Sequence, residues 1–474
     1  MRKFPLAVCM LLVASSFVAA QTIQRLSHQP PDGAGIGFLL TDGTVMYQGN
    51  AESDWYKLTP DNTGSYVNGT WSRLANLPSG YVPDAFASAV LADGRLVIVG
   101  GEYNNGGFAL TNLGAIYDPK TNKWTNLPAP AGWKYIGDSP AVVLPNGNFL
   151  VGNKLLKSMA MLNPKTLTWT VMSGTGKNDF NAEEGWTLLA DGSVLTMDVK
   201  KAPNSERYVP STRSWSTAGS TIVDLHSPSP FGCINYGPGG TLCYYPPGEI
   251  GPAILRPDGT VFATGSYSNT TSGAGHTAIY DTKSKSWSVG PDFPNGDNAG
   301  DSFAVLLPSG NVLVEGAFNS YEWDGTNFNP TIPTPGSLIV LPTGQVLVGG
   351  AEVYNPAGNY EAGWAPTITS VTSSVTRGST YRISGTQFNG LSQAAAFGDE
   401  YETATNYPLV RITNNNSGHV FYARTHDHST MGVATGAVIV FTNFDVPANM
   451  ETGASSLEVV ANGIPSAPVS ITVN

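Results

Sequence analysis

Charged side chains are scarce in this chain: only 12% of its 474 residues are Asp, Glu, Lys or Arg, about half the usual share in globular proteins. That scarcity excludes a coiled coil and a charge-rich disordered chain. The 24 basic residues are outnumbered by 35 acidic ones, so the basic surface that nucleic-acid binding requires is missing. Beyond residue 20 no apolar run reaches the roughly 18 residues of a transmembrane helix, so we expect no membrane span.

Glycine and proline, in contrast, are abundant, with 54 and 34 copies, and 41% of the residues are hydrophobic. Turn formers and apolar residues at this density, with few charges, predict many short strands joined by tight turns. The length corresponds to two or three domains, or to one large all-β domain followed by a small one.

The first twenty residues have the pattern of a secretory signal. Arg2 and Lys3 provide a positive start, residues 6–18 are apolar, and the small residues Ala19 and Ala20 follow. This combination predicts a signal peptide over residues 1–20, cleaved near Ala20. We therefore expect a secreted protein with a periplasmic or extracellular location.

Cysteine is nearly absent, and one of its three copies, Cys9, lies within the predicted signal. Cys233 and Cys243 remain, on either side of the Gly-Pro-Gly-Gly turn at residues 237–240. A hairpin centred on Pro238 places the two cysteines opposite each other, at a separation that a disulfide can bridge. In an oxidising compartment we favour a disulfide that staples this hairpin over catalytic thiol chemistry.

Seven segments between residues 35 and 357 share one pattern. An apolar strand reaches a turn that ends in glycine, most often Asp-Gly or Asn-Gly, and a second apolar strand follows. Asp-Gly and Asn-Gly supply the positive φ angles that a two-residue hairpin needs. The seven turn glycines are Gly43, Gly94, Gly147, Gly192, Gly259, Gly310 and Gly344.

A second pattern follows several of these hairpins: a turn sequence and then a tryptophan, as in residues 117–124, 162–169 and 280–287. It predicts a third and a fourth strand, with the tryptophan packed between neighbouring sheets. Four strands per repeat, at a period of about 50 residues, are typical of a Kelch-type β-propeller. We predict seven blades over residues 21–364, with residues 22–26 free to complete the last one.

A different pattern begins near residue 365. Short alternating strands recur over the rest of the chain, for example in residues 381–388 and 469–473. They fit an immunoglobulin-like sandwich over residues 365–474. The predicted fold is therefore all-β, a seven-bladed Kelch-type propeller followed by an immunoglobulin-like domain, and we expect a monomer.

A secretory signal, seven Kelch-like repeats and an immunoglobulin-like C-terminal domain together resemble the galactose oxidase and glyoxal oxidase family of secreted proteins. The C-terminal segment also looks like the early-set (IPT/TIG) domain of that family. The resemblance implies one copper ion at the hub of the propeller. Its ligands would be tyrosines and a histidine at the starts of the innermost strands and a histidine from a C-terminal loop, with one tyrosine cross-linked to a cysteine.

In this sequence the matching positions, shortly before the turn glycines, carry no Tyr-His pair. The C-terminal loop at residues 398–402 contains Asp399 and two glutamates where the family has its histidine. We therefore do not expect copper or the copper-radical mechanism. Five of the matching positions hold acids instead: Asp84, Asp138, Glu183, Glu249 and Asp301.

If these five acids converge on the axis, their repulsion must be relieved by protons, by a cation or by a cationic ligand. Oxygen ligands favour a hard ion, so Ca²⁺ or another hard divalent cation at the hub is one hypothesis. The alternative is structural: each acid bonds backbone N–H groups at the entrance of the neighbouring blade.

A second polar cluster lies in residues 424–429 and contains His426 and His428. Histidines two positions apart face the same side of a strand. With Asp399 they make a candidate metal site, although zinc sites need three or four protein ligands. The alternative is a hydrogen-bonded strand end that docks the second domain onto the first.

These patterns leave two classes of function. The one we favour is a binding or scaffold protein that recognises an extracellular carbohydrate or polymer at its acidic hub face, where aromatic loop residues such as Trp133 and Tyr267 would suit sugar rings. The alternative is an enzyme, either a divergent galactose oxidase-like oxidoreductase or a metal-assisted carbohydrate-active enzyme that uses the ring of acids.

Overall fold

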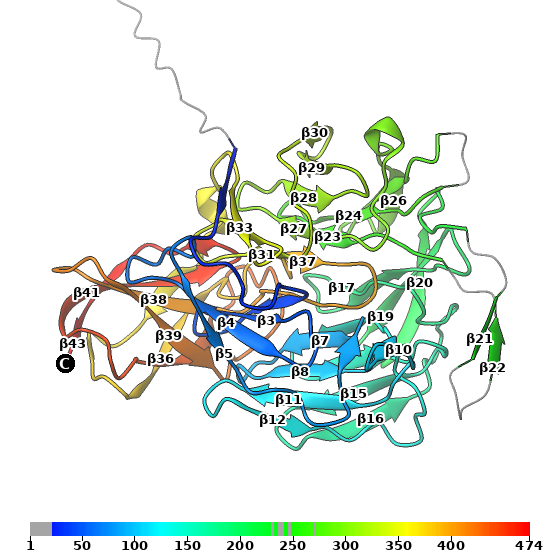
Figure 1. Ribbon diagram of the computed structural model, residues 1–474. Helices are drawn as coiled ribbons and strands as arrows, with labels where there is room; N and C mark the ends of the chain where they lie inside the picture. Colours follow the sequence, from blue (N-terminus) through cyan, green and yellow to red (C-terminus); the bar gives the residue numbers. More distant parts are fainter. Residues whose placement is uncertain (1–20, 229–231, 236–240, 245–247, 269–271) are drawn as a thin grey trace, which may run out of the picture.

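The computed structural model describes residues 21–228, 232–235, 241–244, 248–268 and 272–474, so the predicted signal peptide lies outside the described residues. These residues form an all-β structure in which the helices are short 3₁₀ turns, η2 (Pro294–Gly296) and η3 (Ala362–Trp364). None of the described helices is long and apolar enough to cross a membrane. Figure 1 shows many small sheets in the first part of the chain and one larger sheet beside them.

The first part of the chain contains seven sheets of four or five strands, which we number sheet 1 to sheet 7 in chain order. Each sheet grows from one of the predicted hairpins, and its neighbouring strands pair antiparallel. Sheets 1 to 3 contain β2 (Gly37–Leu39), β3 (Val45–Gln48), β4 (Trp55–Thr59) and β5 (Thr70–Arg73); β7 (Ala87–Val90), β8 (Leu96–Val99), β11 (Gly114–Asp118) and β12 (Lys123–Asn126); and β13 (Ala141–Val143), β14 (Phe149–Gly152), β15 (Met159–Asn163) and β16 (Thr168–Met172). Sheets 4 and 5 contain β17 (Thr187–Leu188), β18 (Val194–Met197), β19 (Asn204–Val209) and β20 (Ser214–Ser220); and β23 (Ala253–Leu255), β24 (Thr260–Thr264), β25 (Thr277–Asp281) and β26 (Ser286–Val289). Sheets 6 and 7 contain β27 (Ala304–Leu306), β28 (Val312–Glu315), β29 (Ser320–Trp323) and β30 (Phe328–Pro330); and β31 (Leu338–Val340), β32 (Val346–Val348), β33 (Glu352–Asn355) and β1 (Thr22–Arg25).

The predicted hairpin turns are all present. Each of the seven turn glycines has a φ angle between +75° and +85°, a conformation that side chains with a Cβ rarely adopt. Each turn joins the first strand of its sheet to the second. The repeat of the sequence therefore corresponds directly to the repeat of the sheets.

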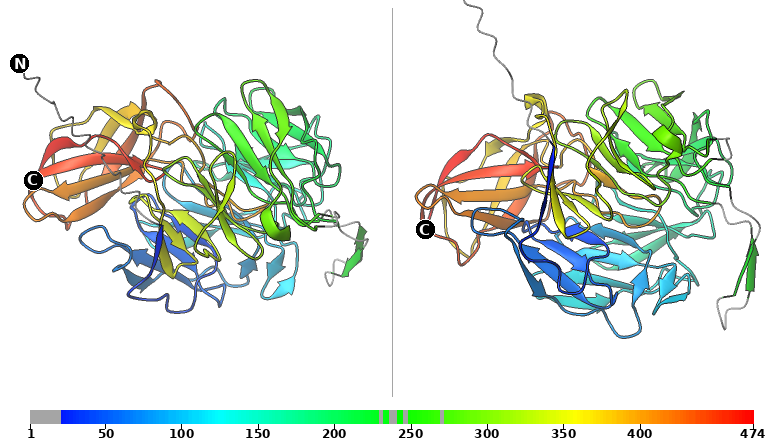
Figure 2. Two further views of the ribbon diagram at one scale, coloured as in Figure 1. Left: turned by 90° about the horizontal axis from the view of Figure 1, so that it is seen from above. Right: turned by 45° about the horizontal axis from the view of Figure 1, so that its top comes forward.

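The first strands of the sheets face one another around a common axis, which makes the arrangement propeller-like. β31 contacts both β2 and β27, β23 contacts β17 and β27, and β7 contacts β13. The ring closes through the N-terminus, as the sequence predicted, because β1 pairs with β33 and places Thr22 opposite Asn355. Figure 2 shows this body and the C-terminal sheet beside it from two further sides.

Tryptophans of the outer strands tie neighbouring sheets together, again as predicted. The indole N–H of Trp124 in sheet 2 donates to the carbonyl of Ala75, just after the last strand of sheet 1, at 3.1 Å. Trp169 in sheet 3 makes the same kind of bond to Pro128, just after sheet 2, at 2.7 Å. Each of these half-buried indoles packs between two sheets and has a partner for its N–H donor.

Two smaller sheets extend this body. One contains β6 (Pro83–Asp84), β9 (Tyr103–Asn104) and β10 (Gly107–Phe108). The other is a hairpin of β21 (Gly232–Asn235) and β22 (Thr241–Tyr244), in which Cys233 lies directly opposite Cys243. The predicted register of the two cysteines is therefore confirmed, while their disulfide stays a prediction.

The C-terminal part forms one continuous sheet with its own hydrophobic core, which includes Val375, Ile383, Val410 and Phe444. β35 pairs parallel with β43, and the strands on the main path are otherwise antiparallel. The strands are β34 (Thr367–Ser370), β35 (Ser374–Val375), β36 (Thr380–Thr386), β38 (Leu409–Asn414), β39 (Val420–His426), β40 (Val440–Asp445), β41 (Gly453–Ala461), β42 (Ile464–Pro465) and β43 (Val469–Val473).

Between β36 and β38 the chain leaves the C-terminal sheet and runs along the axis of the first part. We call residues 391–407 the axial segment. It contains β37 (Ala395–Ala396), which pairs with β27 of sheet 6 and is labelled near the middle of the ring in Figure 1. A Cβ on Gly185 would lie 2.2 Å from the carbonyl oxygen of Gly398, so only glycine permits this close approach.

Side chains of the axial segment satisfy the free edges of the innermost strands. The carboxylate of Glu402 accepts the N–H of Ala141 at 2.6 Å and the N–H of Ser88 at 3.2 Å. The amide oxygen of Gln393 accepts the N–H of Leu188 at 2.6 Å. Sheets 2, 3 and 4 thus obtain the hydrogen-bond partners that buried edge amides require.

We predict that Glu402→Ala destabilises the fold, because it leaves the amides of Ser88 and Ala141 unpaired. The cost should be roughly 1–3 kcal/mol for each amide. Glu402→Gln keeps one acceptor and should lose less, and Glu361→Ala, at an exposed position, should lose almost nothing. Urea unfolding of the three variants measures these differences; equal midpoints for Glu402→Ala and Glu361→Ala would contradict the prediction.

Candidate functional site

A buried lysine lies at the centre of the predicted acidic hub. The ammonium group of Lys154 contacts the carboxylate of Asp138, lies 2.5 Å from that of Glu183, and lies 3.6 Å from that of Asp399. The Lys154 side chain is only 3% exposed. The structure therefore brings together two of the five predicted blade acids, the predicted acid of the C-terminal loop, and a cation that the sequence analysis did not identify.

A residue with a left-handed φ angle lies at or next to each of the five acids. Glu183 and Asp301 themselves have left-handed φ angles of +56° and +48°, and glycines with positive φ precede Asp138 and Glu249. Asp84 precedes Ala85, whose φ is +49°. The repeated turn directs the chain from an outer strand into an innermost strand, and it brings all five acids to the same end of the axis.

The charged side chains at the centre of the hub stabilise one another because they lie close together. Burial opposes ionisation of Lys154, yet the charges of Asp138, Glu183 and Asp399 hold its pKa well above the usual value. Burial also opposes ionisation of Asp399, but a hydrogen bond from Glu400 and the charge of Lys154 lower the pKa of Asp399. The shifts in pKa of Lys154 and of Asp399 therefore both favour the charged form of the side chain.

Asp138, Glu183 and Glu249 bind protons more strongly than free carboxyl groups do. Burial, opposed by the charge of Lys154, raises the pKa of Asp138 to about 8. Burial raises the pKa of Glu183 well above its usual range, and burial with the charge of Asp301 raises that of Glu249 to about 9. These carboxyl groups act as both donors and acceptors while protonated.

Glu249 and Asp301 form the open rim of the hub. Their carboxyl groups hydrogen-bond to each other, Glu249 is half-buried and Asp301 is exposed. Neither makes a salt bridge to a Lys, Arg or His among the residues that the structure describes. This pair thus differs from Asp138 and Glu183, whose charges Lys154 already offsets.

The fifth blade acid, Asp84, lies on the other side of the hub. Tyr401 of the axial segment donates its hydroxyl to the Asp84 carboxylate, and the hydroxyl oxygen accepts the N–H of Ala85 at 2.7 Å. Glu102 and the 38%-exposed Tyr103 lie nearby, and burial, opposed by the charge of Lys154, raises the pKa of Glu102. The hub therefore carries a ring of oxygen groups and one exposed aromatic side chain.

A signal for Lys154 was present in the sequence. Lys154 and Glu102 occupy the same place in successive repeats, two residues after the glycine that ends the second strand, in Gly152-Asn153-Lys154 and Gly100-Gly101-Glu102. Charged residues at an equivalent position of two repeats, in a chain with few charges, point to the same end of the axis.

A second buried lysine resembles the first but is closed to solvent. The ammonium group of Lys177 lies 2.6 Å from Glu184 and 2.9 Å from Glu206, and the side chains of Lys177 and Glu184 are 0% exposed. Lys177 also lies 4.6 Å from the ring centre of Trp215. This cluster fixes the loops around sheet 4 and offers no access to a ligand.

The predicted histidine site is not assembled. β39 ends at His426, and Asp427 has a left-handed φ of +53°, so His426 and His428 do not share one face of a strand. His426 bonds to Asp427 and Asp445, while His428 is buried against Thr442, and burial lowers its pKa to about 3. Asp399 lies with Lys154 instead, which favours the structural interpretation of the two histidines.

The donor set of the hub does not fit copper. Carboxyl groups, tyrosine hydroxyls and one ammonium group surround the axis, and the described side chains there include no imidazole, the nitrogen ligand that suits copper. Asp138, Glu183 and Asp399 lie close enough together to hold a hard cation, but the ammonium group of Lys154 occupies the space among them. The predicted Ca²⁺ site stays a hypothesis that would require Lys154 to move.

Comparison with known proteins gives limited similarity. No protein-family model matches the chain. The Kelch-like protein terF of Aspergillus terreus (strain NIH 2624 / FGSC A1156) is 30% identical over 88 residues, which are 18% of this chain and 18% of that protein. The match thus spans less than a fifth of the curated relative.

Among solved structures, a fungal alcohol oxidase of the AA5 family in complex with copper has a TM-score of 0.47 and 13% identity, covering 96% of this chain and 98% of that one. A virginiamycin B lyase from Staphylococcus aureus with Quinupristin has a TM-score of 0.47 and 10% identity, covering 71% and 98%. The all-β, propeller-like fold of this chain accordingly rests on its own sheets.

The raised pKa values predict how stability depends on pH. The pKa of Asp138 rises from 3.8 to about 8 on folding, and that of Glu249 rises from 4.5 to about 9. At a pH between the unfolded and the folded pKa of each group, the folded protein holds a proton that the unfolded chain has released. The free energy of unfolding therefore falls as pH rises. The melting temperature should decrease from about pH 5 to about pH 9.

Glu249→Gln removes one of these protonation equilibria without touching Lys154, so it should make the decrease shallower. The exposed variant Glu361→Gln should follow the wild type. Melting curves recorded by circular dichroism across this range measure both effects, and a wild-type melting temperature that increases with pH would contradict the assignment of protonated acids to the hub.

Proposed function

We propose that this chain is a secreted binding protein: a seven-bladed Kelch-type propeller with an immunoglobulin-like C-terminal domain, whose hub face binds a polar, positively charged extracellular ligand such as an amine-bearing carbohydrate. The seven sheets around one axis support the blade number, and the sheet of residues 367–473 with its own core supports the separate domain. The signal pattern of residues 1–20 supports secretion.

The observation that carries the ligand class is the carboxyl pair of Glu249 and Asp301. Two adjacent carboxyl groups cannot both ionise without a counter-charge, and no basic side chain in the described part of the chain makes a salt bridge to either one. An incoming ammonium group would replace the shared proton and form charge-assisted hydrogen bonds. Asp301 is exposed, so a ligand can reach the pair from solvent.

A carbohydrate that bears amines suits the rest of the rim. Its hydroxyl groups can donate to the oxygens of Asp84 and Glu102, and the exposed ring of Tyr103 offers an apolar face for a sugar ring. Beside Gly398 and Asp399 the described residues leave a cavity of only about 20 Å³, room for about one water molecule. Binding is therefore expected on the face and not in a channel.

An oxidase of the galactose oxidase type is less well supported, because the hub offers no histidine imidazole among its described side chains. The acids that replace those ligands are suited to holding protons and cations. Release of peroxide from sugars or aldehydes in the presence of copper would favour the enzyme over the binding protein.

We predict that a tetramer of glucosamine binds the wild-type protein, and that the double variant Glu249→Gln/Asp301→Asn weakens this binding more than tenfold, since charged hydrogen bonds contribute about 1.5–3 kcal/mol. Isothermal titration calorimetry measures the affinity. Because the ligand displaces a proton from the pair, the affinity should increase with pH over the range in which the amines of the ligand stay protonated, and the heat should depend on the buffer.

The N-acetylated tetramer is the matched uncharged ligand, and it should not distinguish the wild type from the double variant. Glu361→Gln is the matched protein control and should bind glucosamine tetramers as the wild type does. Equal affinity of the double variant and the wild type for the charged tetramer, or no binding to either, would overturn the proposal.

A further inference from the structure

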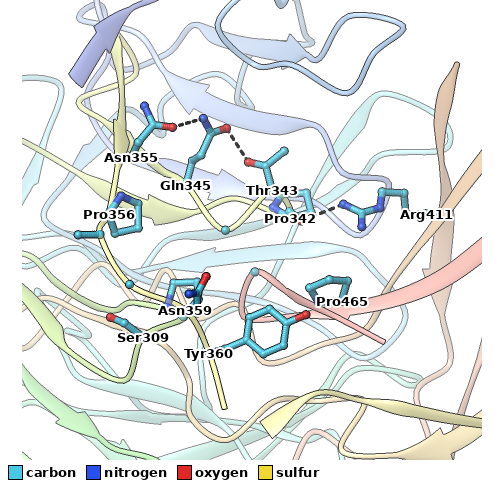
Figure 3. Close-up of a pocket in the computed structure, with 15 residues that line it drawn as sticks. Ser309, Pro342, Thr343, Gln345, Asn355, Pro356, Asn359, Tyr360, Arg411 and Pro465 are labelled. Carbon is cyan, nitrogen blue, oxygen red and sulfur yellow. Dashed lines mark hydrogen bonds between the residues drawn. The ribbon is translucent and has the colours of Figure 1, made fainter. Parts of the chain in front are cut away.

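A second cleft lies away from the hub, where the two domains meet. It has a volume of about 380 Å³, within the range of small-molecule sites. Its walls come from the hairpin turns of sheets 6 and 7, from the linker that follows β33, and from the C-terminal domain. We call it the interdomain cleft, and Figure 3 shows its lining.

One wall of the cleft is a chain of fixed polar groups. Thr343 donates its hydroxyl to the amide oxygen of Gln345 at 2.8 Å, and the Gln345 amide donates to the side-chain oxygen of Asn355 at 2.5 Å. Asn355 in turn donates to the hydroxyl of Thr22 in β1 at 3.1 Å. Each of these hydrogen bonds fixes the orientation of the side chains that it joins, so the wall is preorganised.

The opposite wall carries two polar side chains that have no hydrogen-bond partner among the described residues. Figure 3 shows Asn359 and Tyr360 across the cleft from Gln345. Tyr360 is 39% exposed, and neither side chain has a hydrogen-bond partner among the described residues. An exposed aromatic ring beside a free amide provides an apolar face and both hydrogen-bonding capacities.

The cleft carries no free charge. Arg411 of β38 is its one charged lining residue, and the Arg411 guanidinium is paired with the carboxylate of Glu458 at 2.9 Å. A phosphate or carboxylate ligand would therefore compete with an existing partner. The remaining lining residues are amides, hydroxyl groups, prolines, glycines, an alanine and one tyrosine.

The turn amides in the walls also have hydrogen-bond partners within the protein. The turn amides of Gly310 and Gly344 donate to Leu307 and Leu341, each at 2.9 Å. An extended peptide binds by adding a strand to an open edge, and these closed turns present none. Recognition in this cleft must come from side chains.

We infer that the interdomain cleft binds a neutral saccharide of one or two sugar units, stacked on Tyr360 and hydrogen-bonded to Asn359 and to the Thr343–Gln345–Asn355 chain. A sugar ring has the apolar face and the alternating hydroxyl groups that such walls match. The site is separate from the hub and needs no charge on its ligand. Since both domains line it, an occupied cleft also holds them together.

Titration with a panel of neutral disaccharides (maltose, cellobiose, lactose and xylobiose), followed by saturation-transfer NMR and calorimetry, tests this inference. We expect at least one to bind, and Tyr360→Ala to weaken that binding about tenfold or more, as removal of an aromatic anchor does. Asn359→Ala should weaken it less. The bound disaccharide should also raise the melting temperature of the full chain.

Tyr103→Ala is the matched control, because Tyr103 is a tyrosine of almost equal exposure (38%) on the hub face. It should bind the disaccharide as the wild type does, and so should Glu249→Gln/Asp301→Asn. Failure of the whole panel to bind, or equal affinity of Tyr360→Ala and the wild type, would overturn the inference. Loss of binding in the hub variants alone would do so too, and would place the sugar at the hub.

Discussion

The structure depends on how the innermost strands of the sheets satisfy the hydrogen-bonding groups on their free edges. A ring of sheets around an axis leaves one unpaired edge per sheet facing inward, where water is excluded and an unpaired amide is costly. Here the axial segment provides the partners: β37 extends sheet 6, Gln393 serves sheet 4, and Glu402 serves sheets 2 and 3. The C-terminal part of the chain thus contributes directly to the ring of sheets that it adjoins.

The same segment determines the chemistry of the hub. It ends its course along the axis by placing Asp399 beside Lys154 and Tyr401 beside Asp84. The carboxyl groups at the starts of the innermost strands therefore face a segment that is itself acidic, and burial raises the pKa of Asp138 and of Glu183 beside the ammonium group of Lys154. Only at the rim, where Glu249 and Asp301 meet solvent, does this arrangement remain open to a partner.

The repeated hairpins, the closing strand β1 and the tryptophan contacts could be predicted because each follows from a short stretch of sequence or from the need to close a ring. The acids at the starts of the innermost strands could be predicted for the same reason. The axial segment could not, because its contacts join residues as far apart as Asp84 and Tyr401, which are separated by 317 positions. Lys154 was missed because a lysine in a loop is usually solvated, and the histidine pair failed on one left-handed residue, Asp427.

The pairing of β1 with β33 joins residues up to 333 positions apart. During synthesis from the N-terminus, β1 therefore waits without a partner until all the other strands of the ring have been made. The axial segment is made later still, so the inner edges of sheets 2 to 4 stay unpaired until the C-terminal part of the chain is being synthesised. An intermediate that lacks the axial segment would therefore display unpaired inner edges on sheets 2 to 4, and one that also lacks β33 would display an unpaired β1 at its seam.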